Sequence, residues 1–376
     1  MARNTGSDPS MILMNDFKRE EESLIAAQVA AAERVLRSGW YVLGNEVKEF
    51  ENEWSAWVGA SHSVGVGNGM DALEIGIRAL GIGPGDEVIT TPMTAFATVL
   101  SILRSGAPPV LADIDPNTGI LDPDSADSCI TAKTKAVMVV HLYGQSAPLD
   151  RFAALAKAKK IALIEDCAQA HGAKWNGKPC GTWGEFAGWS FYPTKNLGAI
   201  GDGGALSTET KDLADKSRQL RNYGQSVRYY HPEIGMNSRL DEIQAAFLRE
   251  RLKHLTRWTD QRRVIADKLA TGISNSHVSV LHLPTDTERH VHHLFVVTSP
   301  VRDSLQVHLK NDGIDSLCHY PVPVHHQECC KEIRTAPGGL PNAEHHAKIC
   351  LSIPCHPALT EAEVQHVIDS VNRFKA

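Results

Sequence analysis

The sequence predicts an α/β protein built around a mostly parallel sheet of seven strands. Short apolar runs rich in β-branched residues alternate along the chain with segments of helical periodicity, such as 70–83, 149–160 and 213–224. Most of these runs are almost continuously apolar, which is typical of strands covered by helices on both faces. The seven runs lie at 62–67, 86–92, 108–115, 136–144, 161–167, 188–193 and 203–208.

The order of the segments predicts two domains after a short tail. Residues 1–15 are expected to form a disordered N-terminal tail, and the apolar positions of 20–39 then fit one helix. After Asn237 the strand–helix alternation stops, and 240–273 reads as one long helix or a kinked pair. We therefore predict a large domain over 16–255 and a smaller C-terminal α+β domain over 256–376.

The composition excludes several classes of protein. A net charge of −6 provides no basic excess for nucleic acid. No apolar run approaches the roughly 20 residues of a membrane span, and the N-terminus has no apolar signal segment. Eight cysteines at irregular spacing indicate free thiols in a reducing compartment. We predict a cytoplasmic protein that binds neither nucleic acid nor membrane.

The first candidate site is a glycine-rich turn around Lys195. An apolar strand ends at residues 190–193, and Lys195 lies in the turn that follows, just before four glycines. A lysine held there can be partly desolvated, which lowers its pKa and makes it a nucleophile towards an aldehyde. From this segment alone, a surface lysine in a flexible loop is an equally open interpretation.

The second candidate site follows another buried strand, at 161–167. Asp166 ends that strand, and ligands bind at the carboxyl ends of such strands in open α/β sheets. A carboxylate there can keep a pyridinium nitrogen protonated, which makes a cofactor an electron sink. Gln169 is close enough to bond a ring hydroxyl. The alternative is that Asp166 only caps the next helix.

The third candidate site is the turn Gly67-Asn68-Gly69, between a strand and a helix. The backbone amides at such a helix start can cradle a phosphate. The stretch 67–72 also fits GxGxxA, so a dinucleotide fold is the rival. That fingerprint requires an acidic residue at the end of the second strand, and Asp86 precedes its strand. A single phosphate therefore fits better, and the three sites together predict pyridoxal phosphate bound to Lys195 as a Schiff base.

The order of these motifs resembles the sugar aminotransferases of the DegT/DnrJ/EryC1/StrS family. The resemblance covers about residues 20–370. Its motifs are GWYVLGNEVKEFENEWSAWVG, the phosphate turn, EDCAQAHGA, SFYPTKNLGAIGDGGA, GMNSRLDEIQAA, CHYPVPVHHQ and LSIPCHPALTEAEV. It implies the aspartate-aminotransferase-like fold (fold type I), pyridoxal 5′-phosphate as cofactor and a homodimer with shared active sites.

The resemblance also implies roles for individual residues at the cofactor. Lys195 resembles the Schiff-base lysine, Asp166 the partner of the pyridinium nitrogen and Gln169 the partner of the ring hydroxyl. The implied phosphate contacts are Ser190, the amides of Gly69 and Met70, and Asn237 of the other subunit.

Two positions depart from the family pattern. Members usually have threonine where this chain has Met70, so one hydroxyl contact to the phosphate is missing. Many members place an aromatic residue that stacks on the cofactor ring at the position of Ala95, whereas here Phe96 is the aromatic residue. Phe96 as a core residue of a helix is an equally good interpretation.

A stretch rich in histidine and cysteine, residues 318–330, raises the question of zinc. Zinc sites usually show paired ligands at short, regular spacing in two clusters, and this stretch does not. We therefore predict no metal. Its segment HYPVP resembles a substrate-side loop of the family, which makes His319 and Tyr320 candidates for contacting the sugar.

The resemblance implies an aminotransferase that acts on a nucleotide-linked keto-deoxysugar, with L-glutamate as donor and the C3 ketone favoured over C4. Lys195 would move the proton between donor and cofactor. A cyclitol or acetamido-sugar ketone, a dehydratase and a non-catalytic member remain alternatives. Lys195 counts against a dehydratase, because family dehydratases usually carry histidine there. For the donor carboxylate, Arg239 is the sequence candidate.

Overall fold

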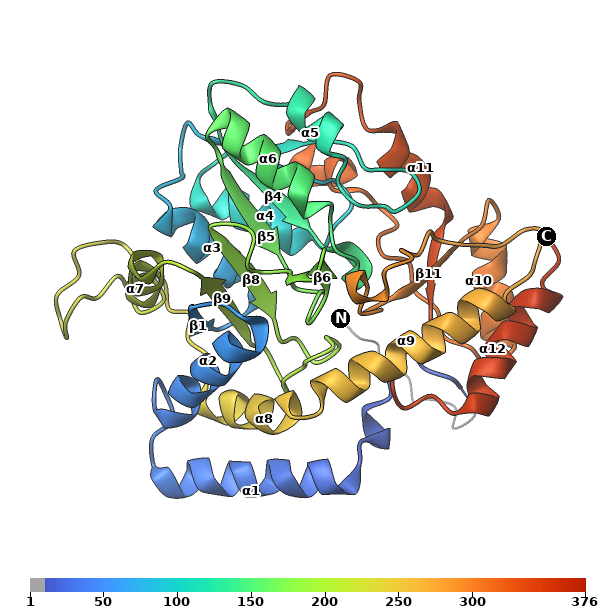
Figure 1. Ribbon diagram of the computed structural model, residues 1–376, viewed down its shortest axis with the longest axis horizontal. Coiled ribbons are helices and arrows are strands. Elements are labelled where there is room, and N and C mark those ends of the chain that lie inside the picture. The colour runs from blue at the N-terminus through green and yellow to red at the C-terminus, as the bar shows by residue number, and fades with distance from the viewer. Residues whose placement is uncertain (1–10) are drawn as a thin grey trace.

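The computed structural model describes residues 11–376, and one large sheet forms its centre (Figure 1). Its strands follow the order β1-β9-β8-β5-β4-β2-β3-β12. Only β9 runs antiparallel to its neighbours, β1 and β8, so the prediction of a mostly parallel sheet is confirmed. The strands are β1 (His62–Val66), β2 (Glu87–Thr90), β3 (Pro109–Leu111), β4 (Thr134–Val140), β5 (Ala162–Asp166), β8 (Phe186–Ser190), β9 (Gly204–Thr208) and β12 (Arg334–Thr335).

The seven predicted runs form seven of these strands, and the eighth comes from the C-terminal part of the chain. The two residues of β12 pair in parallel with β3 at the edge of the sheet. A two-residue strand has no periodicity from which it could be predicted.

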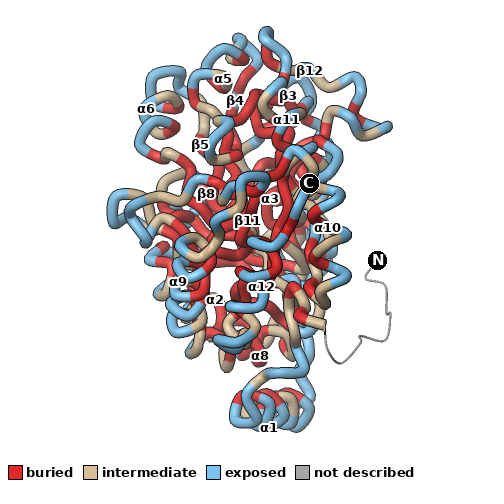
Figure 2. The backbone as a smooth tube through the Cα atoms, turned by 90° about the vertical axis from the view of Figure 1, so that its right-hand side faces the viewer, coloured by how far each residue is buried: buried red, intermediate tan, exposed pale blue. Residues whose placement is uncertain are grey.

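Helices cover both faces of the sheet because successive strand residues point to opposite sides. Along β4, Ala136 and Met138 join the core on one face, and Val137 and Val139 join the core on the other. Figure 2 shows the buried backbone concentrated between these layers. Side chains of α3 (Gly69–Ala79), α4 (Phe96–Ser105) and α7 (Lys211–Leu220) cover the first face. Side chains of α2 (Asn45–Val58), α5 (Pro123–Ser128), α6 (Leu149–Lys159) and α8 (Glu242–Leu252) cover the second.

A second core lies in the C-terminal part of the chain. Three antiparallel strands, β10 (Ser279–Val280), β11 (Phe295–Thr298) and β13 (Cys350–Ile353), pack with α9 (Leu255–Gly272), α10 (Arg302–Asn311) and α12 (Glu361–Arg373). The predicted kinked pair of helices is α8 and α9, and the predicted boundary at 255/256 falls after the first residue of α9. The segment from η4 (Val324–His326) through η5 (Glu328–Cys330) to α11 (Pro341–Ile349) packs against the first core instead.

The predicted tail is wrong for residues 11–15, and residues 1–10 lie outside the described residues. Ile12 and Met14 are buried, and the Ile12 amide donates to the Gly313 carbonyl at 2.8 Å. Burying these two side chains stabilises the ordered segment. After it come η1 (Phe17–Arg19) and α1 (Glu22–Ser38), which packs Ala31 and Val35 against α8.

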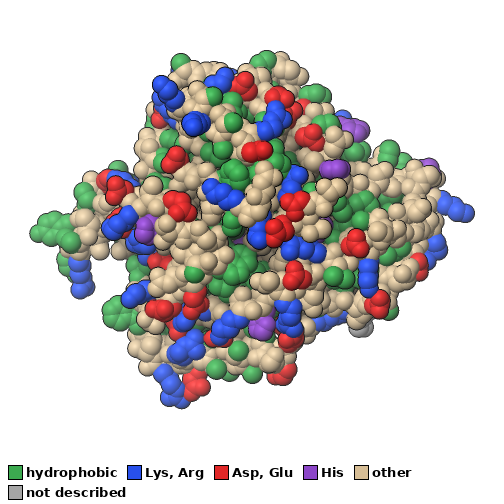
Figure 3. Space-filling model, viewed as in Figure 1, with side chains coloured by type: hydrophobic (Ala, Val, Ile, Leu, Met, Phe, Trp, Pro, Cys, Tyr) green, Lys and Arg blue, Asp and Glu red, His purple; other side chains and the backbone are tan. Residues whose placement is uncertain are grey.

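The remaining short elements are η2 (Leu142–Gly144), η3 (Thr287–Arg289) and the hairpin β6 (Lys174–Trp175) and β7 (Lys178–Pro179). Among the described residues, no helix has the length and apolar character needed to cross a membrane. Figure 3 shows acidic and basic side chains interspersed over one face of the molecule.

Candidate active site

The predicted sites at Asp166 and Lys195 follow neighbouring strands of the sheet, so they lie at the same edge, the one formed by the carboxyl ends of those strands. β5 and β8 are parallel neighbours, with Asp166 opposite Gly188. Asp166 and Ser190 therefore end their strands at the same edge. The N-terminus of α3 reaches this edge too, because a Cβ at Gly69 would lie 2.7 Å from the Ser190 Cβ. Only glycine allows so close an approach.

The start of α3 has the geometry of an anion site. Asn68 is the N-cap, and its side chain accepts from the Asp71 amide at 2.9 Å. The amides of Gly69 and Met70 donate no hydrogen bond to another described residue, so both remain for a ligand. Ser190 stands beside them. This arrangement fits a single phosphate at the positive end of the helix dipole.

Asp166 is a buried carboxylate fixed by two donors. Thr98, in α4, donates its hydroxyl to Oδ2 at 2.6 Å, and the Ala168 amide donates to Oδ1 at 3.1 Å. A turn follows Asp166, so it caps no helix. Sequence analysis missed Thr98, because a contact between positions 68 residues apart leaves no local signal.

Lys195 lies in the turn after β8, where its amide donates to the Tyr192 carbonyl at 2.8 Å. Burial lowers the pKa of its side chain to about 8, against the opposing effect of the Asp166 carboxylate. The flexible surface loop considered from the sequence is therefore not what the structure shows. At pH 7 an amine with this pKa is about one-tenth neutral, a far larger fraction than for an ordinary lysine, and the neutral form can attack an aldehyde.

Gln169 links the carboxyl edge of the sheet to the C-terminal part. Its Oε1 accepts from the Tyr143 amide at 2.6 Å, and its Nε2 donates to the Tyr320 hydroxyl at 3.2 Å. His319 bonds Ser352 at 2.9 Å, and burial together with the charge of Lys195 lowers the pKa of His319 to about 4. The two candidate sugar residues thus lie beside the Lys195 and Gln169 region.

Phe96 is the first residue of α4, and its partly buried side chain packs against the first core. Ala95, just before it, is the N-cap of that helix.

Asn237 is exposed, whereas its neighbour Ser238 is buried. Asn237 lies at the base of an arm (residues 222–238) that leaves the body after α7 (Figure 1). Its neighbour Ser238 turns inward and accepts from the Gly67 amide at 3.0 Å. Asn237 is exposed, and α8 begins at Glu242 with Asp241 as N-cap, so Asn237 does not cap it.

Arg239 is held by the arm. It donates to the Asn222 side chain at 3.2 Å and lies over the Tyr223 ring. It is not among the residues that line the cavity beside Lys195.

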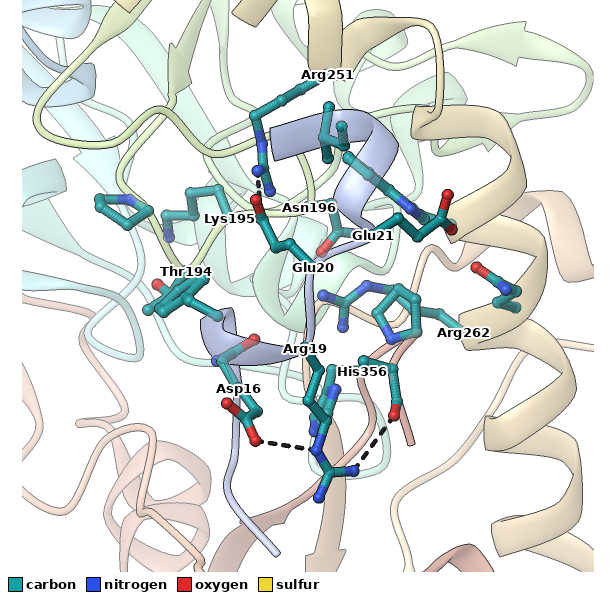
Figure 4. Close-up of a pocket in the computed structure, with 18 residues that line it drawn as sticks. Asp16, Arg19, Glu20, Glu21, Thr194, Lys195, Asn196, Arg251, Arg262 and His356 are labelled. Carbon is teal, nitrogen blue, oxygen red and sulfur yellow. Dashed lines mark hydrogen bonds and ion pairs between the residues drawn. The ribbon is translucent and has the colours of Figure 1, made fainter. Parts of the chain in front are cut away.

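A cavity of about 290 Å³ lies beside Lys195, between the N-terminal segment, α9 and residues 356–358 (Figure 4). Each acidic residue of its wall already has a basic partner. The pairs are Asp16 with Arg19 at 3.0 Å, Glu20 with Arg251, and Glu21 with Arg257 at 2.6 Å.

Arg262 also lines this cavity, but unlike these residues it has no ion-pair partner among the described residues. It projects from α9 into the space (Figure 4) and is 6% exposed. Its Nη1 donates to the carbonyls of His292 at 3.2 Å and Cys355 at 2.5 Å. No carboxylate among the described residues pairs with it, and burial lowers the pKa of its guanidinium to about 10. An uncompensated buried cation favours an anionic ligand.

The amide cradle, the buried carboxylate and the weakly basic lysine match the three parts of pyridoxal phosphate: its phosphate, ring nitrogen and aldehyde. On this fold, they define a pyridoxal-phosphate-dependent aminotransferase of fold type I.

Comparison with known proteins supports this assignment. The model of the DegT/DnrJ/EryC1/StrS aminotransferase family matches residues 22–372, and the chain belongs to this family. A pleiotropic regulatory protein of Geobacillus stearothermophilus is 44% identical, over 96% of this chain and 98% of its own. The dTDP-3-amino-3,4,6-trideoxy-alpha-D-glucose transaminase of Streptomyces venezuelae is 43% identical, over 96% and 95%. The crystal structure of S. venezuelae DesV in complex with a ketimine intermediate superimposes with a TM-score of 0.92, at 44% identity over 96% of both chains.

Proposed function

We propose that this aminotransferase moves an amino group from L-glutamate to the ketone of a nucleotide-linked deoxysugar, at C3 in preference to C4. The main support is the convergence of Lys195, Asp166 and the α3 amides at one sheet edge, in a chain 43% identical to a dTDP-3-amino-sugar transaminase. The general reaction follows from the family, whereas the C3 position rests on the name of that relative.

We propose a role for each of these residues, and the geometry supports these roles. The bound cofactor supplies an electron sink for the carbanion formed at the donor Cα. Asp166 holds the ring nitrogen protonated, Gln169 binds the ring hydroxyl, and Ser190 with the amides of Gly69 and Met70 holds the phosphate. Lys195 would carry the cofactor and, once the donor displaces it, its amine would take the proton from the donor Cα and pass it to the cofactor.

A substrate screen tests this function. The enzyme is converted with L-glutamate to the amine form of its cofactor, and nucleotide keto-sugars are added one at a time. We expect the visible absorption band of the lysine-bound cofactor to return with a dTDP-3-keto-deoxysugar. Return only with an acetamido-sugar or a cyclitol ketone would replace the proposed substrate by that alternative.

A non-catalytic role is the competing hypothesis, given the regulatory name of one relative. The buried Asp166 and the lowered pKa of Lys195 argue against it, since neither is needed for stability alone. Colour separates the two hypotheses: we expect a yellow protein that L-glutamate bleaches. A colourless protein, or a yellow one that glutamate leaves unchanged, would support the non-catalytic role.

We further propose a homodimer whose sites are shared. The arm carries Val227, Tyr229, Tyr230 and Ile234, all more than 60% exposed, and Figure 3 shows apolar side chains at the end of this projection. A second exposed apolar surface lies on and just after α1, at Val29, Leu36 and Trp40. Exposed apolar surface of this kind marks an interaction site, and the exposed Asn237 lies at the base of the arm.

Asn237→Ala should therefore weaken cofactor binding by more than about tenfold, because a charge-assisted hydrogen bond to phosphate is worth roughly 1.5–3 kcal/mol. By linkage, added cofactor should favour the dimer in the wild type more than in the variant. Cofactor titration beside sedimentation measures both effects. A variant that binds the cofactor as tightly as wild type would refute the shared site.

We propose that Arg262 binds the donor carboxylate, because it lines the cavity beside Lys195. Arg239, the candidate from the sequence, does not line that cavity and is the less well-placed of the two. A guanidinium suits a carboxylate, and a cavity of about 290 Å³ suits a small ligand, because the range for such sites begins near 300 Å³. Arg262→Gln should raise the KM for L-glutamate by roughly ten- to hundredfold, the loss expected for one charged hydrogen bond.

Arg263→Gln is the matched control. Arg263 also lies in α9 and donates to a carbonyl, that of His290 at 3.2 Å, but it does not line the cavity. Thermal unfolding of both variants separates binding from structure. If the KM for glutamate rises equally in both, or rises only with a loss of stability, Arg262 is structural.

A further inference from the structure

Two groups of side chains that have no proposed role at the cofactor each bring three possible metal ligands together. His141, Glu165 and Cys167 form a buried group. Glu165 already accepts three backbone amides, at 2.7–3.0 Å, and His141 accepts from the Ala147 amide with Nδ1 and bonds Glu165 with Nε2. The ligand atoms of His141 and Glu165 are thus already hydrogen-bonded within the fold, and all three residues are buried.

The second group is different because it is open to solvent and only loosely bonded. His325 and His326 lie in η4, and Glu344 lies in α11, with all three ligand atoms within 4.8 Å of one another. Oε1 of Glu344 is 3.2 Å from Nε2 of His325 and 3.6 Å from Nε2 of His326. The two rings are tilted by 53° rather than stacked, and Nε2 of each lies near the same oxygen of Glu344.

These separations match the coordination shell of a tetrahedral ion. Zinc bonds of about 2.0–2.2 Å to nitrogen and oxygen place neighbouring tetrahedral ligands ~3.3 Å apart. An ion can therefore enter between the three atoms with small side-chain movements. Three protein ligands leave a fourth position for water, and the half-exposed His326 and Glu344 leave an entry path.

The electrostatics also favour a cation. A neutral imidazole has the lone pair that a metal needs, and the carboxylate supplies negative charge.

We propose that His325, His326 and Glu344 form a site for a divalent transition metal of the zinc class, which ties η4 to α11. η4 lies four residues after Tyr320, whose hydroxyl bonds Gln169. The ion would therefore fix the segment that leads to the cofactor region. The sequence expectation of no metal rested on ligand spacing within 318–330, and Glu344 lies outside that stretch.

Titration of the chelator-dialysed holoenzyme with Zn²⁺, followed by calorimetry, tests the site, and Co²⁺ absorption reports its geometry. We expect one ion per chain at micromolar concentrations or below and a tetrahedral Co²⁺ spectrum. His326→Gln and Glu344→Gln should each weaken binding at least about tenfold, because each removes a ligand. Zn²⁺ should raise the melting temperature of the wild type but not of these variants.

Two controls exclude the other metal-binding side chains nearby. His345 is exposed and adjacent to Glu344 but outside the group, so His345→Gln should bind Zn²⁺ like wild type. Cys329 is exposed, with its Sγ 3.7 Å from that of Cys330, so Cys329→Ser should also bind normally. Loss of binding in Cys329→Ser, equal losses in His345→Gln and His326→Gln, or no binding by the wild type would each overturn the site.

Discussion

Replacement of Lys195 by alanine should reduce transamination by at least about 10³-fold, because a covalent anchor and a general acid–base group are lost together. Lys195 lies in the turn after β8 with a pKa of about 8, and no second lysine of residues 11–376 lines the cavity beside it. Steady-state turnover with L-glutamate measures the loss. Turnover within tenfold of wild type would contradict the assignment.

The cofactor should still bind to Lys195→Ala, since the proposed phosphate and ring contacts do not involve Lys195. Borohydride reduction followed by mass spectrometry should then label the wild type and leave the variant unlabelled. Lys174→Ala is a suitable control, because Lys174 pairs with Glu288 at 2.6 Å on the surface and should be neutral for activity. A variant that is labelled at another lysine would identify the true anchor.

The lowered pKa of Lys195 also predicts how the rate of cofactor capture depends on pH. Only the neutral amine attacks the aldehyde, and its fraction grows as the pH rises through about 8. Capture of added pyridoxal phosphate by the cofactor-free protein should therefore speed up between pH 7 and 9 and level off above that range. A midpoint near the ordinary lysine value would show that the amine is not desolvated as the structure indicates.

The parts of the site that sequence analysis predicted lie at strand ends or helix starts, where local patterns are strong. Asp166 and Ser190 end apolar runs, and Gly69 begins a helix after one. Parallel pairing of β5 and β8 then brings Asp166 and Ser190 to one edge, as α/β architecture requires.

The missed parts depend on tertiary contacts. Thr98, in α4, donates a hydrogen bond to Asp166, and no local sequence pattern predicts that bond. For Arg262 a signal existed: it occupies the buried stripe of α9 with Leu255, Thr259, Ala266 and Leu269, where an arginine is unusual. The apolar run 11–14 likewise indicated burial within a tail that otherwise reads as polar.

Asp166→Asn should slow proton transfer much more than it weakens substrate binding. The variant keeps the shape of the side chain and can still accept from the Ala168 amide, but it loses the negative charge that would face the ring nitrogen of the bound cofactor. A charged hydrogen bond is worth roughly 1.5–3 kcal/mol, so the chemical step should slow by about ten- to hundredfold from this contact alone. The weaker electron sink adds to that loss.

Single-turnover kinetics with α-deuterated L-glutamate separate the steps. In Asp166→Asn we expect a lower rate constant for loss of the visible band and a larger isotope effect, with little change in the concentration of glutamate at half-saturation. Thr98→Val is the graded control. It removes the 2.6 Å hydrogen bond to Oδ2 but leaves the charge, so its rate should fall between those of wild type and Asp166→Asn. If Asp166→Asn changes only the half-saturation concentration, Asp166 binds without assisting proton transfer. If Thr98→Val slows the reaction as much as Asp166→Asn does, orientation of the carboxylate matters more than its charge.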